Sequence, residues 1–218
     1  ALTYQFSPAL VSGDSFSGAL TREAGEDVGS YAITQGTLAL SSNYTLSFTG
    51  NSLTIGTRAV TITADAKSKT YGDADPVLTC QITAGTLAFS DAFTGNLTRV
   101  AGEDVGTYQI QQGTVALNSN YVLSYLPADL TITKAAALTV TADDQGKVYG
   151  AADPTLTYTP NGTLFYGDTY AVITGVKLNT ATGAAATTGT HTITADSGTA
   201  ANYEVAHVNG TLTVSKAA

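Results

Sequence analysis

The 218-residue chain has no methionine, no tryptophan, a single cysteine and only 12% charged residues. With Cys80 alone it cannot form an internal disulfide, which excludes the small secreted scaffolds that disulfides hold together. Without methionine it cannot begin at its own start codon, so we interpret it as an interior piece of a longer protein. No apolar run approaches the ~18 residues of a membrane-spanning helix, so we expect no membrane insertion.

Positive charge is also scarce. Nine Lys and Arg residues stand against 17 Asp and Glu residues, for a net charge of -8. Binding to phosphates depends on clustered basic side chains, so the composition argues against a nucleic-acid partner. Apolar residues, in contrast, make up 43% of the chain. A sequence this apolar and this weakly charged is expected to fold into globular domains and not to be disordered.

The strongest signal in the sequence is an internal repeat. The segment from Gly18 to Phe48 aligns without a gap to the segment from Gly95 to Tyr125, with 22 identities in 31 positions. The spacing is marked by an aspartate that recurs every 77 residues, at Asp14, Asp91 and Asp168. Repeats of this kind indicate a tandem array in which each copy is one structural unit.

The third copy is more divergent and carries a short insertion. We predict three domains, at residues 1–57, 58–136 and 137–218. The second and third copies open with the related sequences "TYGDADP" from Thr70 and "VYGAADP" from Val148. The first copy lacks this opening and its preceding strand, so we expect its sheet to present an open edge.

Alternation with a period of two dominates each copy. The sequences "VTITA" from Val60, "LTIT" from Leu130, "LTVTA" from Leu138 and "LTV" from Leu212 alternate apolar residues with threonine. This pattern is typical of strands with one buried face. We therefore predict an all-β protein of three small sandwich-like domains, with a β-grasp-like fold as the alternative. The short junctions predict an elongated rod of ~90 Å, at ~30 Å for each domain.

The hexapeptide "AGEDVG" occurs twice, at 24–29 and at 101–106. Its acidic pair could form a metal site or a catalytic pair. The third copy, however, has Ala186 and Thr187 in these places, which excludes such a role common to all copies. The spacing Asp-x-Gly-x-Tyr instead predicts a tyrosine corner, in which the phenol bonds back to the chain and glycine supplies an unusual turn. The structural residues are then Gly29, Gly106, Gly189, Tyr31 and Tyr108.

Other recurring residues are also interpreted as structural. We expect Asp14, Asp91 and Asp168 to form turns before a buried aromatic residue. The Asp-Pro openings are expected to end a strand and begin a turn, with Tyr71, Tyr149, Pro76 and Pro154 as structural residues. The alternative for the openings is a calcium ion at the joint between domains. Its candidate ligands are Asp73, Asp75, Asp143, Asp144 and Asp153.

Signatures of catalysis are missing from the sequence. It contains no phosphate loop, dinucleotide fingerprint or nucleophile elbow. Neither histidine, at 191 or 207, has partners at zinc spacing. We expect no enzyme activity, no catalytic residue, no metal site beyond the calcium alternative and no cofactor.

The openings from Thr70 and Val148, the hairpin "GEDVGTYQI" and the closing "NYVLSYLPADLTITK" resemble MBG domains of the Tyr-Gly-x type. The resemblance covers nearly the whole chain. Such domains occur in tandem in large bacterial surface and secreted proteins, including adhesins and biofilm matrix proteins. The resemblance therefore implies an extracellular location and a role in adhesion, and it supplies no catalytic residues to carry over.

Three functions follow as hypotheses. The leading one is a structural stalk whose partners are the neighbouring repeats of the same chain. The second is a module that binds a glycan or a host or matrix protein through exposed aromatic side chains. The third is self-assembly of like chains by strand exchange at the open edge.

Overall fold

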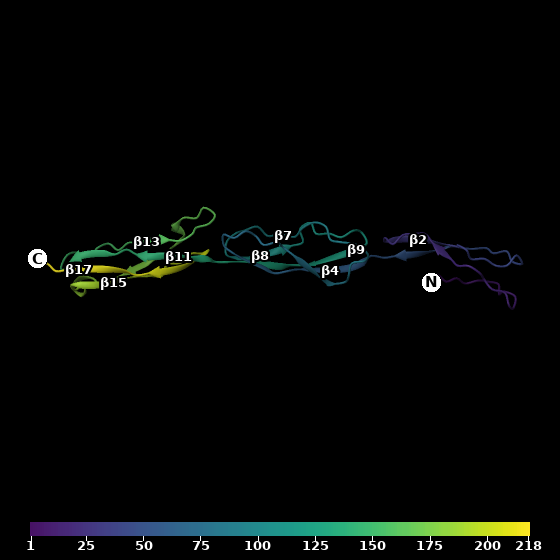
Figure 1. The fold of residues 1–218 in the computed structure, drawn as a ribbon, viewed down its shortest axis with the longest axis horizontal. Coiled ribbons are helices and arrows are strands. Elements are labelled where there is room, and N and C mark those ends of the chain that lie inside the picture. Colours follow the sequence, from purple (N-terminus) through teal and green to yellow (C-terminus); the bar gives the residue numbers. More distant parts are fainter. The chain divides into compact units, whose positions relative to one another are not determined.

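The computed structural model describes all 218 residues, which form 17 β-strands, two short 3₁₀ turns and no α-helix (Figure 1). The predicted all-β class is confirmed. By its internal contacts the chain divides into two compact units, which are described separately. The first unit contains residues 1–62, 82–95 and 115–126, and the second contains residues 63–81, 96–114 and 127–218. We use first, second and third repeat as names for residues 1–57, 58–136 and 137–218.

The third repeat lies wholly within the second unit, and its first strand begins in the same unit two residues earlier, at Ala135. Its elements are β11 (Ala135–Ala142), β12 (Gln145–Val148), β13 (Tyr158–Asn161), the 3₁₀ turn η1 (Tyr170–Val172), β14 (Lys177–Asn179), the 3₁₀ turn η2 (Gly183–Ala185), β15 (Gly189–Asp196), β16 (Tyr203–Val208) and β17 (Gly210–Ser215).

These strands form two small sheets. One has the order β13-β11-β16, and the other has the order β12-β17-β15-β14. In the first, β11 pairs antiparallel with β13 and parallel with β16. In the second, β17 pairs parallel with β12 and antiparallel with β15. Figure 1 shows β11 and β13 on one side of this repeat and β15 and β17 on the other.

The core of the repeat lies between the two sheets. Leu138 and Val140 of β11, Ile193 of β15 and Leu212 of β17 are each 0% exposed and belong to one hydrophobic cluster. The threonines that alternate with them in β11 are only half-buried. This alternation is the pattern from which the strands are predicted, and two facing sheets fit the sandwich-like expectation.

The second repeat is built in the same way from seven strands. They are β4 (Arg58–Ala64), β5 (Lys67–Thr70), β6 (Cys80–Ala84), β7 (Thr98–Arg99), β8 (Gly106–Gln111), β9 (Tyr121–Leu126) and β10 (Ala128–Thr133). In the second unit they form the sheet β5-β10-β8-β7, in which β5 runs parallel to β10. In the first unit β9 and the larger parts of β4 and β6 form the sheet β6-β4-β9.

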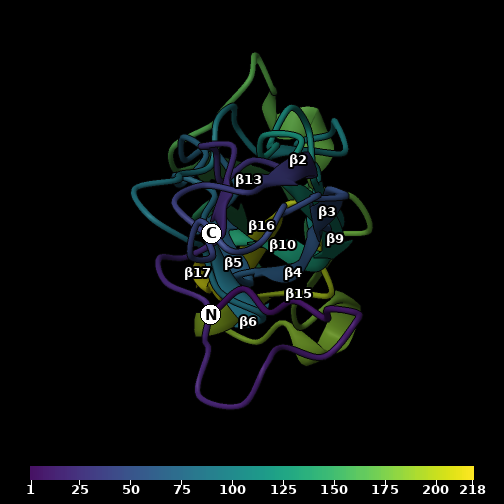
Figure 2. The same cartoon turned by 90° about the vertical axis from the view of Figure 1, so that its right-hand side faces the viewer.

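The first repeat has a single sheet of three strands, in the order β1-β2-β3. They are β1 (Thr21–Arg22), β2 (Gly29–Thr34) and β3 (Asn51–Ile55). The N-terminal residues, drawn in purple in the end-on view of Figure 2, loop away from β2 and β3.

Candidate functional site: the joints between repeats

Each repeat contains the same hydrogen bond between a loop aspartate and a tyrosine, which lies in a strand in the second and third repeats. The phenol oxygens of Tyr44, Tyr121 and Tyr203 donate to the recurring aspartates at 2.6, 2.7 and 2.7 Å. The partners are Asp14, Asp91 and Asp168. Each phenol also accepts a backbone N–H from the loop, at 2.8 to 3.0 Å. In every copy these bonds therefore join the aspartate loop to the segment that carries the tyrosine.

The aspartates form turns, as the sequence predicts. Each backbone N–H donates to the carbonyl three residues earlier, as in Asp91 to Ala88 at 3.1 Å. The aromatic residue two positions later is only half-buried, however, at Phe16, Phe93 and Tyr170. In the second and third repeats the buried ring at this site is the tyrosine of the Asn-Tyr pair, at Tyr121 and Tyr203, which was not among the predicted structural residues. The recurrence of that pair in all three copies is the signal that could have identified it.

The hexapeptide hairpins form the tyrosine corners that their spacing predicts. The Tyr31 phenol donates to the Asp27 carbonyl at 2.7 Å, and the Tyr108 phenol donates to the Asp104 carbonyl at 2.8 Å. In the third repeat the His191 ring nitrogen Nε2 lies 2.7 Å from the Thr187 carbonyl oxygen. Histidine therefore replaces tyrosine in the same contact.

The glycine that the corner requires is not the one predicted. Gly29 and Gly106 lie in strands and do not have a positive φ, so the expectation that they supply the unusual turn is wrong for both. The turn is made four residues earlier, at Gly25 and Gly102, where φ is +146°. A Cβ atom there would lie 2.2 Å from the tyrosine ring, because the ring packs directly against the glycine. In the third repeat Gly189 does adopt a positive φ, of +128°.

An asparagine of the next repeat clasps each acidic hairpin. In the second unit, Asn202 Nδ2 donates to the Asp104 carboxylate at 2.8 Å, and Asn202 Oδ1 accepts the Val105 N–H at 2.9 Å. In the first unit, Asn120 makes the same two contacts with Asp27 and Val28, at 2.7 and 2.8 Å. The aspartate of the Glu-Asp pair is therefore half of a joint between consecutive repeats.

A second contact crosses the joint in the second unit. Tyr71 of the second repeat is 4% exposed and packs edge-on against Tyr166 and Tyr203 of the third, at centroid distances of 5.2 and 5.3 Å. Its phenol donates to the Asp168 carboxylate at 2.9 Å. Burial, together with this hydrogen bond, raises the pKa of Tyr71 to about 12. The equivalent Tyr149 is 46% exposed, so the burial of Tyr71 comes from the repeat that follows it.

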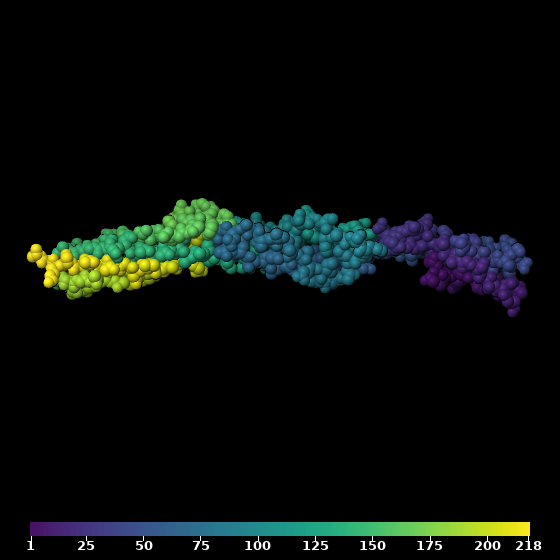
Figure 3. Space-filling model, viewed as in Figure 1, coloured from purple at the N-terminus to yellow at the C-terminus, as the bar shows by residue number.

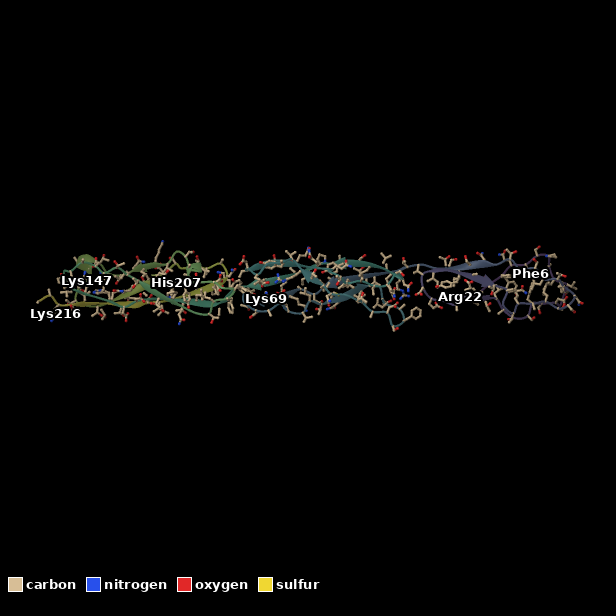
Figure 4. All side chains as sticks on the ribbon, turned by 90° about the horizontal axis from the view of Figure 1, so that it is seen from above. Phe6, Arg22, Lys69, Lys147, His207 and Lys216 are labelled. Atoms are coloured by element: carbon tan, nitrogen blue, oxygen red, sulfur yellow. The ribbon has the colours of Figure 1, made fainter.

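Four charged side chains surround the same hairpin in the second unit. Lys69, with 4% of its side chain exposed, contacts Asp75 at 2.7 Å and Glu103 at 2.5 Å (Figure 4 locates Lys69). Arg99 contacts the same two carboxylates at 2.6 and 2.5 Å, and its guanidinium lies 5.4 Å from the Tyr108 ring centroid. Tyr166 of the third repeat donates to Glu103 at 3.1 Å. The network therefore ties the hairpin to the opening loop and to the next repeat.

This network gives the second unit a predictable acid sensitivity. Hydrogen bonds from Arg99 and Lys69 lower the pKa of Asp75 to about 2, and Lys69 above all lowers that of Glu103. Because the folded state favours the charged carboxylates, their contribution to stability is complete above their ordinary pKa values. It is lost as the pH falls through the lowered values, from about pH 5 to about pH 2.

We expect Glu103→Gln to make the free energy of unfolding less dependent on pH in this range, as measured by urea denaturation at a series of pH values. The matched control is Glu26→Gln, because Glu26 in the first repeat pairs only with Arg22. Equal flattening by both variants, or wild-type stability that increases on acidification, would contradict the prediction.

The calcium candidates do not converge. Asp75 and Asp153 pair with Lys69 and Lys147, and Asp73 accepts the Thr70 N–H. Asp143 accepts the Thr159 hydroxyl, and Asp144 accepts the Thr211 N–H. No group of three or more His, Cys, Asp or Glu side chains is placed to hold a metal ion. The residues present therefore do not fit the oxygen cage that calcium requires.

Each opening ends in an Asp-Pro pair, and the prolines, Pro76 and Pro154, are both half-buried. The glycines after the opening tyrosines, Gly72 and Gly150, have φ of +95° and +82°. At Gly72 a Cβ would lie 2.4 Å from the Phe165 ring of the next repeat. Glycine at this place lets the Tyr-Gly turn approach its neighbour closely.

Comparison with known families gives a match along nearly the whole chain. The family described as MBG domain (YGX type) matches three consecutive segments, at residues 1–54, 60–131 and 138–213. Repeats of this family are typical of extracellular surface proteins and are not known as enzymes. No curated protein matches the chain. None of its helical turns has the length and hydrophobicity needed to cross a lipid bilayer.

Proposed function

The chain belongs to the MBG domain family of the YGX type, and on this basis we propose that it is a non-catalytic stalk of a bacterial extracellular adhesin or biofilm matrix protein. Its repeats act as spacers that hold another part of that protein away from the cell surface. Its partners in this role are the neighbouring repeats of the same chain.

The observation that carries the proposal is the asparagine clasp. Asn120 and Asn202 each bond to both the carboxylate and the backbone of the hairpin before them, so the same contact occurs at both joints. Two hydrogen bonds from one planar amide restrict rotation as well as separation. Such joints suit a spacer, because a chain of repeats stays extended only if consecutive repeats keep a fixed orientation.

Small-angle X-ray scattering tests this function. A rod of ~90 Å has a radius of gyration of roughly 26 Å, whereas a compact globule of this length has about 17 Å. We expect the wild-type chain to reach or exceed the larger value. The double variant Asn120→Ala and Asn202→Ala is expected to give a smaller, broader distribution of dimensions, because each joint loses the two hydrogen bonds that the asparagine makes with the hairpin.

The matched control for the double variant is Asn43→Ala. Asn43 occupies the same place in the first repeat, is exposed and makes no such clasp, so its loss is expected to leave the scattering unchanged. A wild-type radius near that of a globule, or a double variant that scatters as the wild type does, would argue against the stalk.

A further inference from the structure

Two long segments of the third repeat run side by side in the same direction. The leading segment consists of β11 and β12, at residues 135–148, and the closing segment consists of β16 and β17, at residues 203–215. β11 pairs parallel with β16, and β12 pairs parallel with β17. In Figure 3 the yellow residues of the closing segment extend lengthwise beside the green residues of the same repeat.

Hydrogen bonds extend the parallel pairing to both ends of these segments. At one end the Ala135 N–H donates to the carbonyl of Asn202 at 2.9 Å. At the other end the Tyr149 N–H donates to the carbonyl of Ser215 at 2.8 Å. Asn202 is also the residue that clasps the hairpin of the second repeat. The joint and the pairing of the two segments therefore meet in one residue.

The segments are also held together where they pass from one sheet to the other. Asp144, which lies between β11 and β12, accepts the Thr211 N–H of β17 with its carboxylate at 2.7 Å. Gly210 is buried at this place, and a Cβ atom on it would lie 2.4 Å from the Ala142 carbonyl oxygen. Glycine therefore lets the two backbones approach each other closely.

The strands at the two ends of this overlap lie inside their sheets. β11 is the middle strand of the sheet β13-β11-β16, and β17 lies between β12 and β15. Three of their side chains, Leu138, Val140 and Leu212, are 0% exposed, and Val214 is 3% exposed. To slide one segment along the other would therefore break two ladders and disrupt the packed core at the same time.

A parallel pair of the same kind lies just before the third repeat. β5 pairs parallel with β10, as β12 does with β17, and the Tyr71 N–H continues this ladder to the Thr133 carbonyl at 2.8 Å. β10 lies between β5 and β8, and Lys134 alone separates it from β11. A pull along the chain would therefore pass from one internal strand directly to the next.

The direction of pairing decides how two strands respond to a pull. In a parallel pair the start of one strand and the end of the other lie at opposite ends of the ladder. A pull on these two points therefore acts along the strands and across the hydrogen bonds, so all bonds of the ladder carry load together. A pull on two neighbouring ends of an antiparallel pair instead opens the hydrogen bonds one after another.

We propose that the parallel overlap of the leading and closing segments is a tension-bearing clamp, by which the third repeat resists unfolding when it is pulled lengthwise. This inference rests on the proposed stalk function and deepens it, because a stalk that joins an attached part to a cell is pulled along its chain. Under such a load the rate of unfolding decides whether a repeat stays folded.

Single-molecule force spectroscopy on the full chain tests the clamp by changing the direction of the pull. Two variants carry a pair of attachment cysteines at exposed positions, and both contain Cys80→Ala so that no other thiol reacts. Ala136→Cys with Lys216→Cys loads the overlap lengthwise. Thr188→Cys with Lys216→Cys pulls β15 and β17 apart from one end, because these strands are antiparallel. At equal pulling speed we expect the lengthwise pull to require about twice the force or more.

Two core substitutions provide a second measurement under the lengthwise pull. Leu212→Ala and Ile173→Ala each remove a buried aliphatic side chain from the same hydrophobic cluster, so both lower the equilibrium stability. Leu212 lies in β17, whereas Ile173 lies between η1 and β14, outside both segments. We expect Leu212→Ala to lower the unfolding force more than Ile173→Ala does.

Two results would overturn the clamp. The first is an unfolding force that is equal in the two directions or larger for the pull that separates β15 from β17. The second is an equal loss of force from the two core substitutions, or a larger loss from Ile173→Ala. The scattering test of the stalk measures the chain without load, so the clamp and the stalk can fail separately.

Discussion

Replacing Tyr71 by alanine is expected to lower the free energy of unfolding of the second unit by about 3–5 kcal/mol, the usual cost of deleting a buried aromatic side chain. Tyr71 is 4% exposed and contacts Phe165, Tyr166 and Tyr203 of the next repeat. The substitution removes these contacts and one of the two phenols that donate to Asp168. The loss is therefore shared by both sides of the joint. Urea denaturation followed by circular dichroism measures it.

The chain supplies its own control for this experiment. Tyr149 has the same place in the third repeat, but it is 46% exposed. Its replacement by alanine is expected to change the free energy of unfolding by less than about 1 kcal/mol, because the substitution removes little buried apolar surface. Hydrogen exchange should assign the effect of Tyr71→Ala to amides at the joint, such as Val105, which donates to Asn202. Similar costs for the two substitutions would show that Tyr71 acts within its own repeat and not across the joint.

The strands could be predicted from the sequence because their signal is local. Leu138, Val140 and Ala142 are buried in β11, and the threonines between them are not. A period of two leaves one face for the core, and no distant residue is needed to see it. The tyrosine corner was predictable for the same reason, since Tyr31 contacts a carbonyl only four residues earlier.

The joints could not be predicted in this way because their partners are far apart in the sequence. Asn120 meets Asp27 across 93 residues, and Tyr71 meets Asp168 across 97. The alignment of copies shows that these residues recur, and it does not show that the asparagine of one copy faces the hairpin of the copy before it. The position of the strained glycine could not be predicted either, because the sequence does not show which of Gly25 and Gly29 has the positive φ and packs against the tyrosine ring.

The approach of glycine to the tyrosine ring leads to the second large effect, for Gly102→Ala. The backbone φ of +146° is strained for alanine at a cost of about 1–3 kcal/mol. The added Cβ would also lie 2.2 Å from the Tyr108 ring, and relief of that overlap costs a further ~1–3 kcal/mol. We therefore expect a loss of about 2–6 kcal/mol in the free energy of unfolding, measured by urea denaturation.

The hairpin provides the control in Gly106→Ala. Gly106 does not have a positive φ, and the nearest atom to an added Cβ is 3.9 Å away. Alanine should be neutral there, or stabilising by up to about 1 kcal/mol, because it restricts the unfolded chain. If Gly106→Ala were the more damaging change, the turn would be made at the position predicted from the sequence and not at Gly102. Asp104 and Val105, which bond to Asn202, lie between the two glycines. A larger loss of stability for Gly102→Ala than for Gly106→Ala would therefore indicate that the contact with Asn202 depends on the shape of the turn.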